Sequence, residues 1–437
     1  MLFYFVVSNK ICTFAAKSKY MEKELFRTII AENQEYIDRI PLVQRPLDLE
    51  EYGNYVFVGV RQAGKSYLLY QRIQQLLANG VDIENIVYVN FDDERLQGMS
   101  VTDFDLILQA YHSMYDSQPI FFFDEIQNVE GWANFARRLA NQKYRVYITG
   151  SNAKMLSRDI ETVLGGRYLD ISVFPYSFSE YLKAVGVAVT KNWQYGRKAN
   201  ELQRHFRTYF DWGGFPELVH FQEKRVWLNS LYNRIFFNDL VVRHKVKNED
   251  ALRLCVRRLA ESVKQPCSLN RLSNLIKATG TPCSPSTVME YVRYLQESCL
   301  LISIDNYASK FVEKETIKKH YFVDNGLLHL FINNPNTSLL ENLCAITLYK
   351  KYSKGLYYYN RNIEVDFYVP DEGLAVQASY QMSDEETIER EVKALVTLHG
   401  LYPLKRAMII TYEDEGEIVR DGLKIEIRPA WKWVLEG

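Results

Sequence analysis

The chain has 437 residues, of which 47% are hydrophobic and 24% are charged, and its formal net charge is -1. This composition excludes an intrinsically disordered chain, and the length favours two or three domains, each with its own core. The balanced charge gives no argument for nucleic acid, membrane surfaces or acidic substrates, so any such argument must come from local patches. The six cysteines are scattered without a Cys-x-x-Cys pair, which argues against a zinc ribbon or a dense disulfide framework and favours a reducing compartment.

Residues 1–20 contain a short apolar run with no basic residue before it, which makes a poor signal peptide. A charged, helix-compatible stretch begins at Met21, so we expect translation to start there and 1–20 to be a dispensable extension. Elsewhere the apolar runs are shorter than the roughly 20 residues needed to span a bilayer. We therefore expect a cytoplasmic protein without membrane contact.

Residues 54–175 alternate short β-branched and aromatic runs with helix-compatible stretches. This alternation is typical of an α/β fold in which helices cover both faces of a parallel sheet. We assign 21–176 to this three-layer domain. Its expected strands are Tyr55–Val58, Ile86–Phe91, Ile120–Phe123, Arg145–Thr149 and Leu169–Val173.

Residues 59–66 (GVRQAGKS) match the pattern G-x-x-x-x-G-K-[ST] at every fixed position, after an expected strand and before an expected helix. In this pattern the main-chain N–H groups and the helix N-terminus surround phosphates. Lys65 would supply a full charge to the terminal phosphates and the Ser66 hydroxyl would coordinate Mg²⁺. We therefore predict a loop that binds ATP. Its residues are Gly59, Val60, Arg61, Gln62, Ala63, Gly64, Lys65, Ser66 and Tyr67.

Two carboxylates, Asp124 and Glu125, end the hydrophobic strand FFF. Asp124 would hold Mg²⁺ through water, and Glu125 would orient and deprotonate the attacking water. An Asp-Glu pair at a strand end often only makes the protein surface soluble. Beside the phosphate loop, the pair becomes a specific signal for a magnesium and water site. Ser151 or Asn152, after the next strand, is the predicted polar sensor, although an ordinary turn explains both residues equally well. Arg167 is a weaker candidate for contacting phosphate, in the same chain or from a neighbouring one.

The strand Ile86–Phe91 intervenes in chain order between the strand of the phosphate loop and the strand of Asp124. Together with Glu125, this order indicates the additional-strand, catalytic-glutamate division of P-loop proteins. Kinase-like and GTPase-like folds are disfavoured accordingly.

The remaining chain divides into three parts. Residues 177–247 read as an aromatic-rich helical lid or connector around the loop Trp212–Pro216. Residues 248–322 show three short helices followed by a hairpin, which is the order of a winged-helix domain. Residues 323–437 return to strands and contain one helix, which implies a small α/β domain. The expected helices are 252–262, 269–279, 286–297 and 383–399, and the expected strands of the last part are 356–359, 365–369, 375–378 and 407–411.

Six short motifs together resemble a family of AAA-type ATPases of bacteria and archaea that carry a C-terminal domain of unknown function. The resemblance covers nearly all of the chain after Met21 and depends on the order and spacing of the motifs. They are residues 59–66, 89–96, 124–127 with Trp132, 148–151, 174–178 and 213–216. The resemblance implies a P-loop ATPase, a winged helix and a terminal domain with a restriction-endonuclease-type fold.

A nuclease core of that type needs an acidic residue on a helix, an aspartate on one strand, and Glu or Gln followed two residues later by Lys on the next strand. The matching positions are Glu341, Asp366 and Gln377, but Ser379 stands where the lysine is expected. We therefore expect an inactive remnant used for binding, with scattered surface carboxylates as the alternative.

Six basic residues and one acidic residue between Arg253 and Lys277 leave a local excess of five positive charges. This excess suggests contact with DNA, but the expected recognition helix has only Arg293 as a basic residue, and winged helices also dock proteins. Three hypotheses follow: an ATPase that acts as a switch or motor on an unknown protein or DNA partner, an ATP-driven DNA-processing nuclease, and a signalling scaffold that hydrolyses ATP slowly. The AAA resemblance favours a homo-oligomer, although no clear arginine that acts in a neighbouring subunit is visible.

Overall fold

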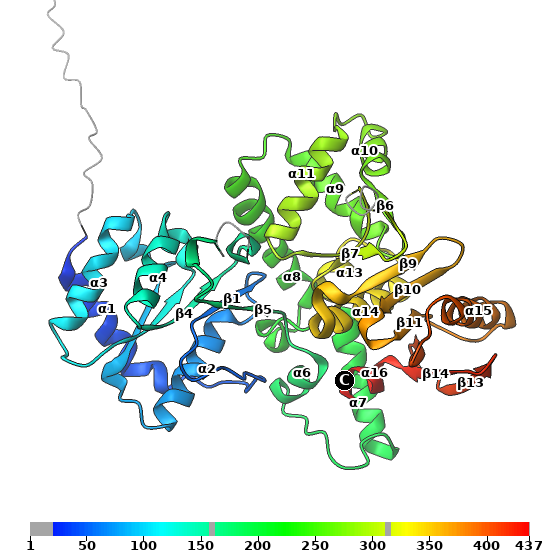
Figure 1. The fold of residues 1–437 in the computed structure, drawn as a ribbon, viewed down its shortest axis with the longest axis horizontal. Coiled ribbons are helices and arrows are strands. Elements are labelled where there is room, and N and C mark those ends of the chain that lie inside the picture. The colour runs from blue at the N-terminus through cyan, green and yellow to red at the C-terminus, as the bar shows by residue number, and fades with distance from the viewer. Residues whose placement is uncertain (1–20, 157–161, 311–315, 437) are drawn as a thin grey trace, which may run out of the picture.

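A computed structural model describes residues 21–156, 162–310 and 316–436 (Figure 1). The predicted extension 1–20 lies outside the described residues. In the described part of the chain, no helix is both long enough and apolar enough to cross a membrane.

The first domain is built on a five-stranded sheet whose spatial order is β2-β3-β4-β1-β5. Every neighbouring pair in this sheet is parallel, which confirms the predicted α/β class. In the sheet, β4 lies between β1 and β3. Strand β2, which comes between β1 and β3 in chain order, lies at the edge of the sheet. The strands are β1 (Tyr55–Gly59), β2 (Ile86–Asn90), β3 (Ile120–Asp124), β4 (Arg145–Gly150) and β5 (Leu169–Val173).

Strands β1 to β4 are buried on both faces, whereas the edge strand β5 is largely exposed, and successive residues of a strand point to opposite faces. In β1, Tyr55 and Phe57 join the core on the side of α2, whereas Val56 and Val58 join a second core with α1, α3 and α4. Because both faces of β1 to β4 are buried, these strands read as nearly continuous apolar runs in the sequence. The helices are α1 (Lys23–Tyr36), α2 (Lys65–Ala78), α3 (Phe104–His112) and α4 (Trp132–Asn141).

A helical connector follows the sheet and lies in the middle of the molecule (Figure 1). Its last helix changes at Ile235 from α-helix to π-helix, and the π-helix η8 ends at Val242. Wide π-turns of this kind occur mostly at functional sites. The connector helices are α6 (Phe178–Ala184), α7 (Gly196–Trp212), α8 (Lys224–Arg234) and η8 (Ile235–Val242).

The second half of the chain forms a nine-stranded mixed sheet in the order β13-β14-β12-β11-β10-β9-β7-β8-β6. Strand β9 pairs with β7 at Asp305 and Asn306, so one ladder crosses the expected boundary between 322 and 323. Helix α14 is buried on nearly every side, which removes any 3.6-residue alternation from its sequence. The strands are β6 (Cys267–Ser268), β7 (Leu301–Asn306), β8 (Ile317–Phe322), β9 (Tyr357–Asn360), β10 (Glu364–Val369), β11 (Leu374–Ala378), β12 (Arg406–Thr411), β13 (Gly416–Arg420) and β14 (Leu423–Pro429). The helices are α9 (Glu249–Glu261), α10 (Leu269–Lys277), α11 (Pro285–Glu297), α13 (Asn325–His329), α14 (Asn336–Tyr352), α15 (Glu385–Leu401) and α16 (Ala430–Glu436).

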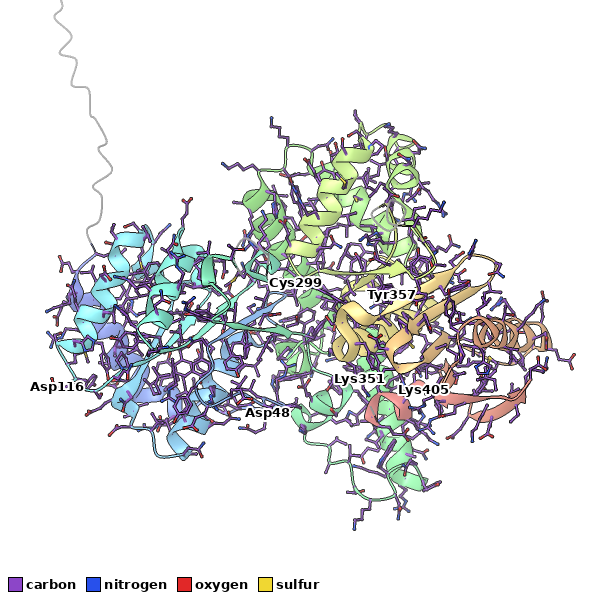
Figure 2. All side chains as sticks on the ribbon, in the orientation of Figure 1. Asp48, Asp116, Cys299, Lys351, Tyr357 and Lys405 are labelled. Carbon is purple, nitrogen blue, oxygen red and sulfur yellow. The ribbon has the colours of Figure 1, made fainter. Side chains whose placement is uncertain are left out.

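The two halves share packed side chains. Figure 2 shows Cys299 near the centre of the molecule, between the sheet of the first domain and the strands of the second half. Cys299 packs against the core of α1, α3 and α4 and also against a larger core that is continuous from α2 through the connector into the second half. The connector and the second half are therefore packed directly against the first domain.

Candidate functional site

The predicted phosphate loop lies between β1 and α2 and has the backbone that such a loop requires. Gly64 has φ 96° and Gln62 has φ 61°, both in the left-handed region that favours glycine. A Cβ atom on Gly59 would lie 2.0 Å from the carbonyl oxygen of Val173, so only glycine fits where β1 ends. Lys65 begins α2, and its Nζ atom donates hydrogen bonds to the carbonyl oxygens of Gly59 and Val60, each at 3.3 Å.

The two predicted carboxylates lie opposite this loop. The Nζ atom of Lys65 is 3.2 Å from Oε1 of Glu125, and both side chains are largely buried. Burial acts to raise the pKa of Glu125, but the positive charge of Lys65, a hydrogen bond from Gln127 and the charge of Arg61 outweigh burial and lower it. Glu125 is therefore held as a carboxylate beside the phosphate loop.

Asp124 is 1% exposed and ends strand β3. Its Oδ2 atom accepts a hydrogen bond of 2.7 Å from the Tyr88 hydroxyl, and its Oδ1 atom accepts one from Thr149. Ser66 also hydrogen-bonds to it. Burial and then the neighbouring Glu125 charge raise the pKa of Asp124, and these three hydroxyls act against that rise.

The residues at and after the end of β4 lie next to the carboxylates at the end of β3. Gln127 Nε2 donates to Glu125 Oε2 at 2.5 Å and to Ser151 Oγ at 3.4 Å, so the predicted sensor Ser151 is connected to Glu125 through Gln127. The side chain of Asn152 instead accepts a hydrogen bond from the main-chain N–H of Lys154 and caps its own turn. Thr149 also accepts a hydrogen bond from the Glu125 N–H at 2.9 Å. Gln127 and Thr149 were not predicted, because each is an ordinary residue until the two strand ends are side by side.

Arg167 is not brought to the phosphate loop of its own chain. It precedes β5, and because Leu169 pairs with Tyr55 at the start of β1, it lies at the sheet edge opposite the phosphate loop. Its guanidinium donates to the carbonyl oxygen of Gly165 within its own turn. Contact of Arg167 with the nucleotide of a neighbouring chain stays a prediction.

A cavity of about 240 Å³ opens between the phosphate loop and the two carboxylates. Asn90 and Asp92 line it from the end of β2, and Arg234 reaches it from the end of α8. Asn90 and Asp92 lie in the motif 89–96, but no site role was predicted for them or for Arg234, because only the folded chain brings β2 and the connector to the loop. The predicted residues that line it are Arg61, Gln62, Gly64, Lys65, Ser66, Tyr67, Asp124 and Glu125.

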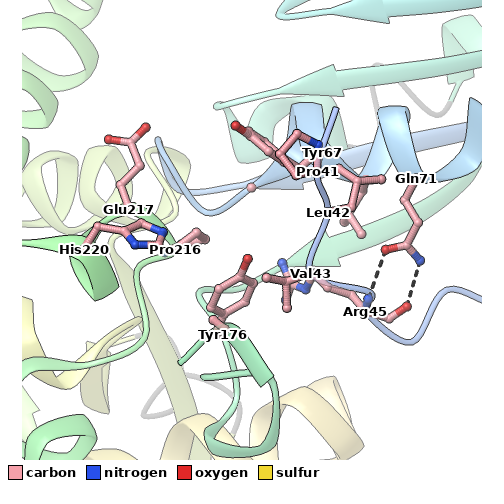
Figure 3. Close-up of a pocket in the computed structure, with 13 residues that line it drawn as sticks. Pro41, Leu42, Val43, Arg45, Tyr67, Gln71, Tyr176, Pro216, Glu217 and His220 are labelled. Carbon is pink, nitrogen blue, oxygen red and sulfur yellow. Dashed lines mark hydrogen bonds between the residues drawn. The ribbon is translucent and has the colours of Figure 1, made fainter. Parts of the chain in front are cut away.

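A second cavity, of about 390 Å³, continues from the first, and Gly64, Tyr67, Pro216 and Glu217 line both. Figure 3 shows Tyr67 and Tyr176 on opposite sides of this cavity, with His220 at its far wall.

The segment 41–45 forms the remaining wall of this second cavity. The Arg45 N–H donates to Gln71 Oε1 at 3.0 Å, and Gln71 Nε2 donates to the Arg45 carbonyl at 2.8 Å (Figure 3). The Arg45 guanidinium pairs with Glu180 at 2.8 Å and also donates to the carbonyl of Ala63. These contacts fix the wall against α2, the phosphate loop and the connector.

The predicted C-terminal residues do come together, around a lysine that the sequence pattern did not indicate. Lys319 of β8 is 0% exposed, and its Nζ atom lies 3.1 Å from Glu341 and 2.9 Å from Asp366. The amide of Gln377 is used by the main chain: Oε1 accepts from Asp366 N–H and Nε2 donates to the Glu364 carbonyl. Ser379, which stands where the nuclease motif has a lysine, carries no positive charge, but Lys319 supplies one from β8, a strand far away in the sequence.

Two pKa shifts follow from this arrangement. Burial and then the nearby Asp366 charge raise the pKa of Glu341 to about 7. Burial opposes the charge of Lys319, but Asp366, Glu341, Tyr321 and Glu364 together raise its pKa well above the usual range. Lys319 is therefore a permanent buried cation that pairs with Glu341 and Asp366, and these two carboxylates line a cavity of about 610 Å³.

The basic residues between 253 and 277 do not form one free surface. The Arg253 guanidinium lies 3.9 Å from the ring centroid of Phe236 in the connector. Arg257 and Arg258 both pair with Glu261. These three arginines therefore use their positive charge in contacts within the chain.

Comparison with known proteins places these observations in a family. Residues 52–182 match the AAA domain, and residues 203–338 match a domain of unknown function (DUF8612). An uncharacterised protein of Methanocaldococcus jannaschii is 31% identical over 434 residues, covering 95% of this chain and 96% of its own length. An uncharacterised protein of Haemophilus influenzae is 30% identical over 394 residues, covering 87% of this chain and 94% of its own length.

The Walker-type ATPase PABY2304 of Pyrococcus abyssi is a more distant structural match, with 12% identity and a TM-score of 0.41 over 72% of this chain and 97% of its own. That likeness is too low to carry an argument. The chain is at least 30% identical to these two relatives over nearly their whole length, so it belongs to the same family as these archaeal and bacterial proteins, with an AAA domain of the P-loop ATPase type at residues 52–182.

Proposed function

We propose that the chain hydrolyses ATP with Mg²⁺ between the phosphate loop 59–66 and the pair Asp124 and Glu125, and that its nucleotide state moves the connector and the second half of the chain as a switch or motor on a macromolecule. The observation that carries this proposal is the 3.2 Å contact between Lys65 and Glu125 across a cavity lined by the loop. A cation and a carboxylate held at this distance can face one terminal phosphate and its attacking water.

In this mechanism the loop amides and Lys65 bind the phosphates, and their positive charge stabilises the negative charge that develops in the transition state. Glu125 accepts the proton of the attacking water, and its lowered pKa keeps it in the unprotonated form that this role requires. Gln127 orients Glu125 by the hydrogen bond of 2.5 Å.

The oxygen donors fit magnesium. Mg²⁺ prefers oxygen ligands and commonly shares its coordination between one or two protein groups and substrate phosphates. Ser66 and Asp124 offer a hydroxyl and a carboxylate on the same side of the cavity. When bound, the ion would neutralise phosphate charge. In the described residues no group of three or more His, Cys, Asp or Glu could hold a metal, so a substrate-shared site is the arrangement that these donors support.

The second cavity is proposed to hold the base of the nucleotide. Tyr67 and Tyr176 offer aromatic faces, and the main chain of 41–45 offers polar groups beside them. Stacking on an aromatic ring contributes on the order of 1–3 kcal/mol per base. Because Tyr67 is 54% exposed, its removal should leave folding intact. Tyr67→Ala should therefore weaken ATP binding about tenfold and leave tripolyphosphate binding within about twofold. Tyr52→Ala, at a residue that is 79% exposed, is the matched control. An equal loss of both ligands would contradict a base site here.

The proposal as a whole is tested by equilibrium titration with ATP and Mg²⁺. The Lys65→Ala variant should lose measurable ATP binding, and Glu125→Gln should retain it. Equal ATP affinity of the wild type and Lys65→Ala would refute the site. Single-turnover kinetics separate a motor or switch from a slow signalling scaffold, because the scaffold would convert bound ATP far more slowly than it binds it.

The partner is best sought with the Glu125→Gln variant held in its ATP state, since a trapped complex should keep its partner. Anisotropy titration of this variant with duplex DNA tests the DNA alternative, and binding that does not respond to salt concentration would remove it.

The cluster around Lys319 supports the proposal that the C-terminal domain binds a ligand and does not cleave it. The ammonium already pairs with the two carboxylates that a catalytic metal would need, and the amide of Gln377 is hydrogen-bonded to the main chain through both its oxygen and its nitrogen. Metal-dependent cleavage of DNA by the wild type that is lost in Asp366→Ala would overturn this view in favour of a nuclease.

A further inference from the structure

One buried carboxylate of the connector holds both the phosphate loop and the end of β4. Asp239, in the π-helix η8, is 2% exposed. Its Oδ2 and Oδ1 atoms accept hydrogen bonds from Nε and Nη2 of Arg61, each at 3.0 Å, so the pair is bidentate. Oδ1 also accepts from Arg243 at 2.9 Å, and Arg243 in turn donates to the main-chain carbonyl of Ser151 at 3.4 Å. Asp239 therefore joins two parts of the nucleotide site to one helix.

The charges make this junction difficult to break. A buried carboxylate that loses its cationic partners is strongly destabilised, whereas the two arginines are partly exposed and can turn to water. The hydrogen bonds that Arg61 donates to Asp239 are the main cause that raises the pKa of Arg61, and the charge of Arg61 in turn helps to lower the pKa of Glu125. Arg61 is thus held by the connector within electrostatic reach of the catalytic carboxylate.

The same π-helix contacts α9 on another side. The Arg253 guanidinium of α9 lies 3.9 Å from the ring centroid of Phe236 and 5.2 Å from that of Phe237. Phe236 is fully buried. Arg234, one residue before the π-helix, lines the cavity between the phosphate loop and the carboxylates. Residues 234–243 therefore lie between the nucleotide site and the helical region that begins at Glu249.

We propose that Asp239 is a positioning residue of the ATPase site, which orients Arg61 for turnover and transmits nucleotide binding from the phosphate loop to α9 through the π-helix. The inference rests on the proposed function. Phosphates bind to the main chain of the loop that carries Arg61, so a change in that loop moves the Arg61 guanidinium. Asp239 follows Arg61 because loss of the bidentate pair would leave this buried carboxylate with one cation, Arg243, in place of two. The π-helix then carries Phe236 and Phe237 with it, and α9 moves because Arg253 packs on these two rings.

A double-mutant cycle tests the positioning role. Arg61→Gln and Asp239→Asn should each lower kcat about tenfold with the Kd for ATP changed less than about threefold, and the double variant should be no slower than the slower single variant, because both remove one interaction. Arg61→Lys keeps a cation beside Asp239 and should recover part of the rate. Losses that multiply in the double variant, or single variants within twofold of the wild-type kcat, would overturn the role. If Asp239→Asn does not fold, the comparison of Arg61→Lys with Arg61→Gln decides: equal rates overturn it.

Hydrogen exchange tests the transmission, in the Glu125→Gln background with Mg²⁺ and ATP. Addition of nucleotide should slow exchange in peptides covering 59–66 and in peptides covering 249–261. In the Asp239→Asn variant of this background, only the 59–66 peptides should respond. Glu426→Gln, which removes an exposed pair with Arg406, is the control and should respond like its parent. An unchanged response of 249–261 in Asp239→Asn would overturn the inference alone, whereas no response of 59–66 in any variant would overturn the proposed function with it.

Discussion

The ammonium nitrogen of Lys65 lies 3.2 Å from Oε1 of Glu125, so the two groups proposed to face the terminal phosphate are in direct contact with each other. The ion pair is largely buried, and each partner stabilises the charge of the other. A triphosphate that binds to Lys65 must therefore compete with the Glu125 carboxylate. In the absence of nucleotide, the charge of Lys65 is therefore neutralised by Glu125 of the same chain.

The competition predicts that Glu125→Gln binds ATP more tightly than the wild type. Removal of the carboxylate charge frees Lys65 for the phosphates, and a close charge pair of this kind contributes on the order of 1 kcal/mol or more, which corresponds to an affinity gain of about fivefold. Titration calorimetry with ATP and Mg²⁺ measures the change. Weaker binding by Glu125→Gln would mean that the contact does not compete with the nucleotide.

The raised pKa of Glu341 predicts a stability that depends on pH. The group titrates at about 7 in the folded chain and at 4.5 as a free side chain, so between these values the folded state holds a proton that the unfolded state has lost. The free energy of unfolding should therefore decrease as the pH rises from about 4.5 to about 7, by on the order of 3 kcal/mol from this group. Urea unfolding across this range should show a smaller decrease for Glu341→Gln. The same slope in both proteins would contradict the assignment.

The loop of Gly213 and Gly214 depends on the absence of side chains. Gly213 has φ 77°, and a Cβ atom there would lie 1.9 Å from Oδ1 of Asp324, whose Oδ2 atom accepts a hydrogen bond of 2.8 Å from the Gly214 N–H. Gly213→Ala should lower the free energy of unfolding by roughly 3 kcal/mol or more, since it combines backbone strain with a clash against a buried carboxylate. Gly280→Ala is the matched control: its φ is 84° with no atom within 4 Å of the Cβ position, so it should cost about 1 kcal/mol. Equal losses in thermal unfolding would show that the contact with Asp324 is not important.

The first domain could be predicted closely, because its signals are local. All five predicted strands are confirmed within a residue or two at each end, since β-branched and aromatic runs between turns mark strands without any knowledge of distant contacts. The phosphate loop is likewise one continuous segment. The spatial order of the strands was less accessible: β4, and not β2, separates the strand of the loop from the strand of Asp124.

The contacts between distant segments could not be predicted. Arg61 and Asp239 are 178 residues apart, and Lys319 and Asp366 are 47 residues apart, so neither pair leaves a spacing pattern in the sequence. Because Ser379 stands at the motif position of the lysine, the sequence predicted a cluster without a cation. The motif covers residues of one strand only, so it could not show that a lysine from another strand packs beside it. Strand β6 has only two residues, which is too short for any periodicity.

Steady-state ATP hydrolysis with Mg²⁺ tests the central claim most directly, by comparing the wild type with Glu125→Gln and Lys65→Ala at saturating ATP. Loss of a general base lowers a rate by roughly 10² to 10⁴. The account predicts hydrolysis by the wild type, a loss of this size in Glu125→Gln with ATP binding retained, and no hydrolysis by Lys65→Ala. Turnover of Glu125→Gln within about twofold of the wild type would contradict it, because the carboxylate beside Lys65 would then have no part in the chemistry.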